Sequence, residues 1–149
     1  MILFADTDHT KQKILKKIEV NFDIVDLGQI RKILGVEFIL DGKRAFMSQT
    51  AYILKLAYKY KLVPNSLVKV PATVGTTLTR DLNVLPNEFS YRSLIGSLSF
   101  LASRMRPDIL YSVIVLSQYN GAHTTKHVKA LMQVLQYVLN TAEYSIDMS

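Results

Sequence analysis

The stretch from residue 91 to residue 121 most constrains the fold, because it predicts two helices separated by a proline break. In its first half, apolar residues recur at spacings of three and four, which is the pattern of an amphipathic helix. These apolar residues are Tyr91, Leu94, Ile95, Leu98, Leu101, Ala102 and Met105. Ser90 can cap the start of this helix, and Pro107 ends it and suits the first turn of the next. The pair Asn120-Gly121 is typical of a helix end.

The opposite face of the first predicted helix is small, polar and free of acidic residues. If the apolar stripe faces the core, the residues that face outward are Arg92, Gly96, Ser99, Phe100 and Ser103, with Ser97 at the border. A solvated helix face usually carries several charges, so this face is suited to close approach by a partner. The alternative is that Gly96 packs against Ile114 or Leu135 within a helical bundle.

The first half of the chain predicts a mixture of strands and helices, and hence an α+β fold. A short apolar run at residues 2–5 predicts a strand, and residues 11–22 have the pattern of an amphipathic helix. Residues 33–40 and 43–47 are expected to be strands, since they are rich in apolar and β-branched side chains. The Asp-Gly pair at residues 41–42 is a strong signal for a hairpin turn between these strands.

Three parts of the chain are expected. The first, residues 1–62, contains the small hairpin and a helix that is capped by Ser48 and runs to about Tyr60. Residues 63–88 contain three prolines and no clear periodicity, so they are interpreted as a linker. Residues 89–149 are expected to form an all-helical subdomain whose final residues trail off without regular structure. Its three helices are expected to begin near Tyr91, Pro107 and Lys126.

Composition excludes several classes of protein. The 149 residues contain no cysteine, which excludes disulfides, thiolate zinc sites and a cysteine nucleophile. No apolar run is long enough to cross a membrane, and the first residues lack the pattern of a signal peptide, so an intracellular protein without a membrane partner is expected. The net charge of +6 favours a polyanionic partner.

No catalytic or metal-binding group of residues is evident. Asp6 and Asp8 form an Asp-x-Asp pair, but a capped turn before a helix is favoured over a weak cation site. The three histidines, His9, His123 and His127, do not have the spacing of a metal site, and His127 is expected to be solvated on the outer face of the last helix. No catalytic residue and no metal ligand is therefore assigned.

Five segments, in order along the chain, resemble copia-type long-terminal-repeat retrotransposon Pol polyproteins. The longest match, residues 91–113, reads YRSLIGSLSFLASRMRPDILYSV. The others read NFDIVDLGQIRKILGVEF, AFMSQTAYILKLAYKYKL, VKVPATVGTTL and HTTKHVKALMQVLQYVLNTAEYSI. The resemblance covers almost the whole chain. It implies a truncated piece of the reverse transcriptase region, from the end of the palm through the primer grip to the thumb.

The resemblance also implies a partner and the residues that contact it. Residues 11–22 would be the last palm helix, and the segment from about Tyr91 would be the thumb. The primer grip would contain Leu34, Gly35, Val36 and Glu37, and thumb contacts are expected at Arg92, Gly96, Ser97 and Phe100. The implied partner is an RNA/DNA primer–template duplex that is bound irrespective of its sequence. Other segments of the Pol polyprotein are a further candidate.

Polymerase chemistry is not expected from this chain alone. The complete family enzyme uses Mg²⁺ held by an early palm aspartate and by a Tyr-Val-Asp-Asp hairpin, and the early strand is absent here. A gapless alignment ends that hairpin just before Met1; in the alternative alignment residues 4–7 (Phe-Ala-Asp-Thr) are its decayed form. The carboxylate set is incomplete in both, so no cofactor is expected to bind this chain. The second functional hypothesis is a domesticated helical protein-interaction module.

Overall fold

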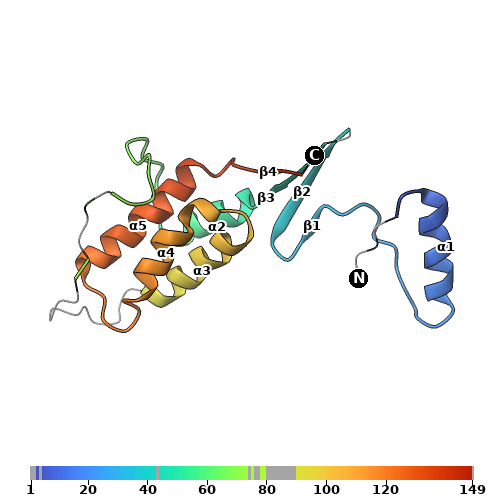
Figure 1. Cartoon of the computed structure of the whole chain (residues 1–149), viewed down its shortest axis with the longest axis horizontal. Helices are drawn as coiled ribbons and strands as arrows, with labels where there is room; N and C mark the ends of the chain where they lie inside the picture. The colour runs from blue at the N-terminus through green and yellow to red at the C-terminus, as the bar shows by residue number, and fades with distance from the viewer. Residues whose placement is uncertain are drawn as a thin grey trace. The chain divides into compact units, whose positions relative to one another are not determined.

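The computed structural model describes Leu3 and residues 5–42, 44–73, 75, 78–79 and 90–148. These residues form an α+β fold with a four-stranded antiparallel sheet and five α-helices, as expected (Figure 1). The chain divides into two units, residues 1–30 and residues 31–149. No helix among the described residues has the length and apolarity needed to cross a membrane.

The first unit contains a single helix, α1 (Asp8–Glu19), which begins three residues before the predicted start. Thr7 caps it, because its hydroxyl accepts a hydrogen bond from the amide of Thr10 at 3.2 Å. Lys11 pairs with Asp26 at 2.8 Å, and the hydrogen bond from Lys11 lowers the pKa of Asp26. α1 buries none of its residues within this unit.

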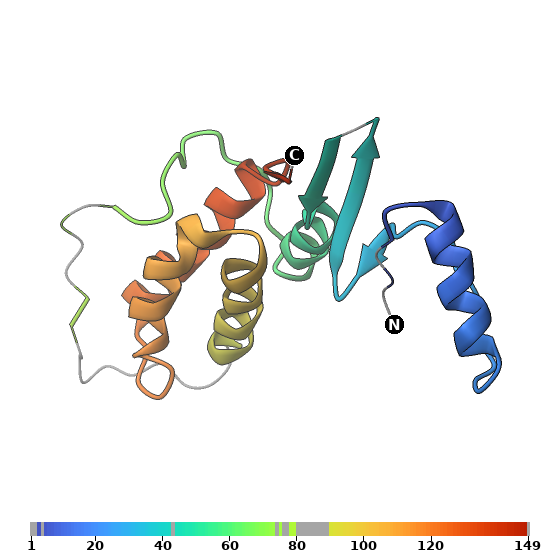
Figure 2. The same ribbon diagram turned by 45° about the vertical axis from the view of Figure 1, so that its right-hand side comes forward.

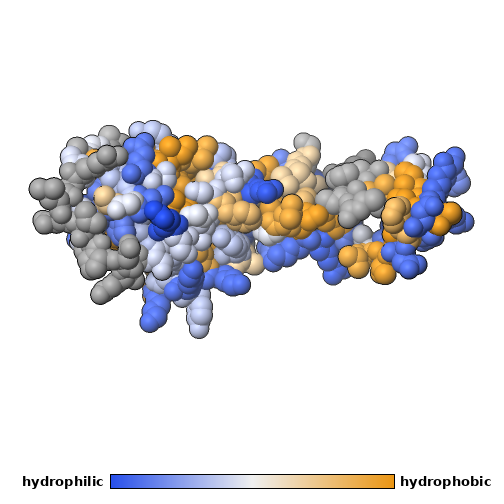
Figure 3. All heavy atoms as spheres, turned by 90° about the horizontal axis from the view of Figure 1, so that it is seen from below, coloured by the Kyte–Doolittle hydropathy of each residue, from blue (hydrophilic) through white to orange (hydrophobic). Residues whose placement is uncertain are grey.

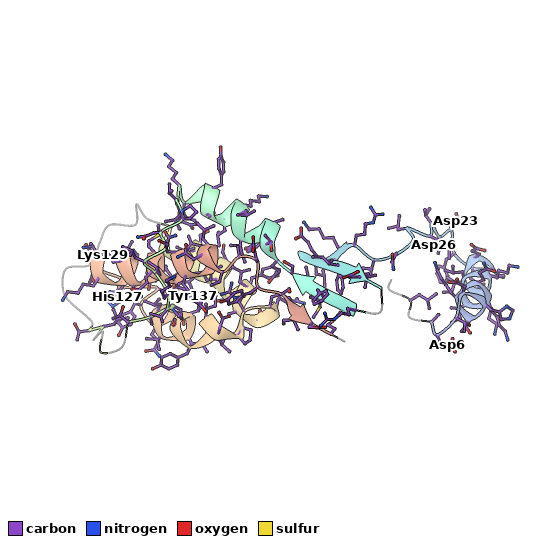
Figure 4. All side chains as sticks on the ribbon, turned by 90° about the horizontal axis from the view of Figure 1, so that it is seen from above. Asp6, Asp23, Asp26, His127, Lys129 and Tyr137 are labelled. Atoms are coloured by element: carbon purple, nitrogen blue, oxygen red, sulfur yellow. The ribbon has the colours of Figure 1, made fainter. Side chains whose placement is uncertain are left out.

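The aspartates of the first unit are spread over it. Figure 4 shows Asp6 on the opposite side of this unit from Asp23 and Asp26. The described part of the chain contains no group of three potential metal ligands. The predicted strand at residues 2–5, and the alternative motif at residues 4–7, lie partly outside the described residues.

The sheet of the second unit has the strand order β1-β2-β3-β4, with every neighbouring pair antiparallel. Its strands are β1 (Lys32–Ile33), β2 (Val36–Asp41), β3 (Arg44–Ser48) and β4 (Ile146–Asp147). A hairpin turn follows β2 as predicted, but Asp41 still belongs to the strand, where it pairs with Arg44. Two sequence-based expectations were wrong. A turn at Leu34-Gly35 interrupts the strand predicted for residues 33–40, and the end of the chain forms β4 instead of trailing off.

The rest of the second unit is a helical bundle (Figure 2). Its elements are α2 (Thr50–Lys59), α3 (Tyr91–Arg104), the 3-10 turn η1 (Pro107–Ile109), α4 (Leu110–Ser117) and α5 (Thr125–Asn140). Two predicted helix starts after residue 89 are confirmed to within a residue, since α3 begins at Tyr91 and α5 at Thr125. At Pro107 the 3-10 turn η1 forms instead, and α4 begins only at Leu110. The predicted apolar stripe of α3 is buried and forms the core together with the inward side of α5. The largest buried aliphatic side chains include Ile53, Leu94, Leu98, Leu101, Leu131 and Leu135.

The predicted boundary at residue 62 falls inside the second unit. α2 packs against α5, and β4, which follows α5, pairs with β3. The hairpin, α2 and the later helices therefore share one compact unit. Residues 80–88 of the expected linker lie outside the described residues.

A buried arginine joins the end of α3 to the end of α5. Arg106 is 2% exposed, and its guanidinium donates to both carboxylate oxygens of Asp108, at 2.9 and 2.8 Å. It also donates to the carbonyl and the hydroxyl of Thr141, at 3.1 and 2.6 Å. The rings of Tyr137 and Tyr144 each lie 5.4 Å from its central carbon. Partial burial alone would raise the pKa of Asp108, but the hydrogen bonds and charge of Arg106 bring it below its usual value.

Candidate nucleic-acid interface

The outward face of α3 is open at its glycine. No described atom lies within 4 Å of the position that a Cβ on Gly96 would take, and Gly96 is exposed. The alternative in which Gly96 packs inside the bundle is therefore wrong. Arg92 is exposed one turn earlier, and the half-buried Ser97 donates its hydroxyl to the carbonyl of Ser93 at 3.0 Å. Because Gly96 has no side chain, the sugar–phosphate backbone of a nucleic acid could approach the helix closely at this position.

Two side-chain contacts connect α2 with α3 beside this open surface. The ammonium group of Lys59 lies 3.4 Å from the hydroxyl of Ser93, and the ring centroids of Tyr52 and Phe100 are 5.2 Å apart. Tyr52 and Lys59 are seven residues apart on α2, and Ser93 and Phe100 are seven residues apart on α3, which is about two turns in each helix. Because the start of α2 contacts the later part of α3, the two helices run in opposite directions here. Gly96 lies on α3 between these two contacts.

This surface is basic and contains no acidic residue. Residues 49–62 and 90–106, which include both helices, contain no Asp or Glu. Lys55 lies on the same side of α2 as Tyr52 and Lys59, because its spacings to them are three and four residues. We call the surface formed by Lys55, Lys59, Arg92, Gly96 and Ser97 the α2–α3 face. Its three cationic side chains are all exposed.

Phe100 occupies a different position from the one expected. Its ring is half-buried against Tyr52, and a Cβ on Gly35 would lie 3.3 Å from the ring edge. The guanidinium of Arg104 lies 5.8 Å from the ring centroid. Phe100 thus packs between α2 and the β1–β2 turn rather than standing free on the outer face. Its contact with nucleic acid stays a prediction.

The four residues of the predicted primer grip have different environments. Leu34 and Gly35 form the two-residue turn between β1 and β2, both with positive φ, at 48° and 78°. The Leu34 side chain is 68% exposed, whereas Val36 is buried. Glu37 is half-buried and pairs with Lys32 at 3.4 Å. Only Leu34 therefore presents a large, exposed apolar side chain to a partner.

The left-handed conformation of Leu34 predicts a stabilising substitution. A leucine is strained at positive φ, whereas asparagine tolerates this conformation and is common in such turns. We expect Leu34→Asn to raise the free energy of unfolding by about 1 kcal/mol. Chemical denaturation of both chains measures this, with Leu40→Asn, an exposed strand position, as the control. A lower stability for Leu34→Asn would show that the Leu34 side chain stabilises the fold.

A shallow apolar pocket lies beside this turn. Its volume is about 200 Å³, and hydrophobic side chains gather over the sheet in Figure 3. The pocket is lined by Ile33, Leu34, Val36, Phe38, Met47, Arg104 and Met105. Sequence reasoning missed this pocket, and it also missed Lys59, because both depend on how separate elements pack.

The expected exposure of His127 was wrong. This side chain is 1% exposed, and its Nδ1 accepts a hydrogen bond from the amide of Thr124 at 3.0 Å, which completes a capping box at the start of α5 (Figure 4). Its ring centroid lies 3.9 Å from that of Tyr119. His123 is also buried, and its ring is stacked on Tyr91 with centroids 4.5 Å apart. Both histidines thus pack the bundle around the start of α5.

Curated relatives match most of the chain. It is 31% identical over 133 residues to the Retrovirus-related Pol polyprotein from transposon RE2 of Arabidopsis thaliana, covering 89% of this chain and 9% of that protein. It is 30% identical over 147 residues to the corresponding polyprotein from transposon RE1 of the same plant, covering 97% and 10%. A putative transposon Ty5-1 protein of Saccharomyces cerevisiae is 29% identical, over 90% of this chain and 43% of that protein.

These relatives establish the family. The chain belongs to the retrotransposon Pol polyproteins, as its motifs predicted. Within them it is of the copia type, and it spans about a tenth of the length of the two plant polyproteins. No family model matches the chain, and no solved structure matches it significantly.

Proposed function

We propose that this chain is the part of a copia-type reverse transcriptase that joins the end of the palm to the thumb, and that it binds a primer–template duplex irrespective of sequence. The observation that carries the proposal is the α2–α3 face, where Gly96 is open and three cations are exposed on two helices without acidic residues. Phosphates are bound by such cations, and a side-chain-free position lets a sugar–phosphate backbone approach closely. The homologous Pol polyproteins support a partner of this kind.

The proposed contacts involve the backbone and shape of the duplex rather than its bases. Lysine and arginine bind phosphates without reading sequence, and the α2–α3 face offers no asparagine or glutamine that could pair with a base edge. A-form duplexes are recognised in this way, through phosphates and the shallow minor groove. Affinity is therefore expected to depend strongly on salt and little on sequence.

Loss of one cation from the α2–α3 face should weaken binding for all sequences alike. We expect Arg92→Ala to lower the slope of log affinity against log salt by about one ion, because one phosphate contact is removed. Fluorescence anisotropy with two hybrid duplexes of unrelated sequence measures this. Lys129→Ala is the matched control, since Lys129 is exposed on α5, outside the α2–α3 face. An equal change of slope in both variants would contradict the assignment of Arg92.

The chain alone is not expected to extend a primer. Polymerases of this kind hold Mg²⁺ with several carboxylates, and the described residues contain no group of three potential ligands. A primer-extension assay with Mg²⁺ tests this. Activity above background that Asp6→Asn abolishes would contradict the proposal.

A second function, a protein-interaction module, is favoured by one observation. Leu110, Tyr111 and Ile114 form an exposed apolar patch on α4, where a solvated helix would carry charges. Duplex binding separates the two functions. The interaction module would be favoured by two results together: the chain binds no duplex at low salt, and Tyr111→Asp lowers its self-association or its binding to a protein partner.

A further inference from the structure

We infer that Phe100 is a positioning residue that seats the Leu34-Gly35 turn, so that the Leu34 side chain contacts a duplex bound on the α2–α3 face. This inference rests on the proposed function and refines it, because it separates the residue that touches the duplex from the residue that holds it in place. It also differs from the sequence-based expectation that Phe100 itself packs against sugars.

The turn is held by two side chains from different helices. The edge of the Phe100 ring on α3 lies 3.3 Å from where a Gly35 Cβ would be, so only glycine fits without displacement. From the start of α2, the side-chain amide of Gln49 reaches the carbonyl of Gly35, at 3.4 Å. Gln49 is 2% exposed and Phe100 packs on Tyr52, so both supports are anchored in the folded unit. The turn is thereby fixed against α2 and α3.

The strain of the turn falls on its exposed residue. Leu34 has a φ of 48°, a conformation that a bulky side chain rarely adopts, yet its side chain is 68% exposed. Burial of the Leu34 side chain therefore stabilises the fold too little to offset this strain. Strained residues persist where surrounding contacts determine the backbone, and they are frequent at ligand-binding positions. Phe100 and Gln49 are the contacts that determine it here.

The position of the turn suits a strand that crosses Gly96. Phe100 follows Gly96 by four residues, a rise of about 6 Å along α3. Leu34 lines the same pocket as Arg104, which lies one further turn along α3, so the turn is beside the end of this helix and beyond the open glycine. A strand that is bound at Arg92 and Gly96 and that continues along α3 would pass the exposed Leu34 side chain.

The test compares Leu34→Ala, Phe100→Leu and the double variant in binding to a fluorescein-labelled RNA–DNA hybrid duplex. Loss of one apolar contact of this size weakens binding about fivefold. If Phe100 acts through Leu34, each single variant loses about this factor, and the double variant loses no more than either single one. Leu40→Ala, which truncates an exposed leucine at the other end of β2, is the matched control and should bind as the unaltered chain does. Losses that multiply in the double variant would mean that Phe100 contacts the duplex itself, and would overturn the inference.

A second measurement requires no nucleic acid. Amide hydrogen exchange of residues 33–37 should accelerate at least tenfold in Phe100→Leu, while the amides of α5 keep their protection. Unchanged exchange in the turn would show that Phe100 does not hold it, whatever the binding data. If the unaltered chain binds no duplex, the proposed function fails, and the exchange measurement still decides whether Phe100 seats the turn.

Discussion

Arg106→Leu is expected to lower the free energy of unfolding by about 3 kcal/mol, which would reduce the melting temperature by roughly 10 °C. The guanidinium makes hydrogen bonds to Asp108 and to both oxygen atoms of Thr141, and nothing in a leucine replaces them. Removing one partner of a buried pair leaves the other uncompensated. Asp108 is partly exposed and can regain water, which places the loss at the lower end of the range for buried pairs.

Two further variants show whether the effect belongs to the buried guanidinium. Arg104→Leu removes an exposed arginine two residues away and should change stability by about 0.5 kcal/mol or less. Arg106→Lys keeps the charge but lacks the planar fork that binds Asp108 and Thr141 together, so it should recover only part of the loss. Thermal denaturation followed by circular dichroism measures all three. Equal melting temperatures for Arg104→Leu and Arg106→Leu would contradict the structural role of Arg106.

Gly96→Leu is expected to reduce duplex binding more than tenfold without destabilising the chain. The new side chain would project from the α2–α3 face into space that no described atom occupies. Because leucine favours a helix more than glycine does, stability should rise by up to about 1 kcal/mol. Gly96→Ala is the matched control: it gives a similar gain in stability, but its single methyl group should leave most of the affinity.

The combined results for binding and stability identify how Gly96 acts. If Gly96→Leu unfolds the chain, Gly96 is a packing residue and the α2–α3 face is not open. If Gly96→Leu binds the duplex as well as Gly96→Ala does, the face is open but the duplex does not use it.

The helices after residue 89 could be predicted because local signals and packing agree. The apolar stripe of α3 matches the helix that the structure contains, and the proline at residue 107 follows the end of that helix. The same stripe correctly placed Gly96 and Arg92 on the exposed side of α3, since burial of one face fixes the other. This part of the candidate site follows from periodicity alone.

The turn at residues 34–35 could not be predicted in the same way. Leucine favours neither a turn nor positive φ, so Ile33 to Leu40 has the pattern of one continuous strand. The turn forms because Phe100 and Gln49, which are distant in sequence, support its backbone. The sequence does not show that the turn and α2 pack against Phe100. Phe100 was therefore expected to stand free on the outer face, whereas both elements partly cover it.

Buried polar residues were the other source of error. His127 precedes Leu131 by four residues and Val134 by seven, so it shares the buried side of α5, where its ring caps the start of the helix and packs on Tyr119. Arg106 received no structural role from the sequence, although the nearby Asp108 is a possible signal for an ion pair. The more distant partners, Tyr119 for His127 and Thr141 for Arg106, become neighbours only in the folded bundle.

Binding of a hybrid RNA–DNA duplex as a function of salt tests the central proposal most directly. The purified chain is titrated against two duplexes of unrelated sequence at increasing salt concentrations, and log affinity is plotted against log salt. We expect equal affinities for both sequences and a negative slope of about two to three ions, one for each cation of the α2–α3 face that contacts a phosphate. Absence of binding at low salt, or an affinity that is independent of salt, would contradict the proposed function.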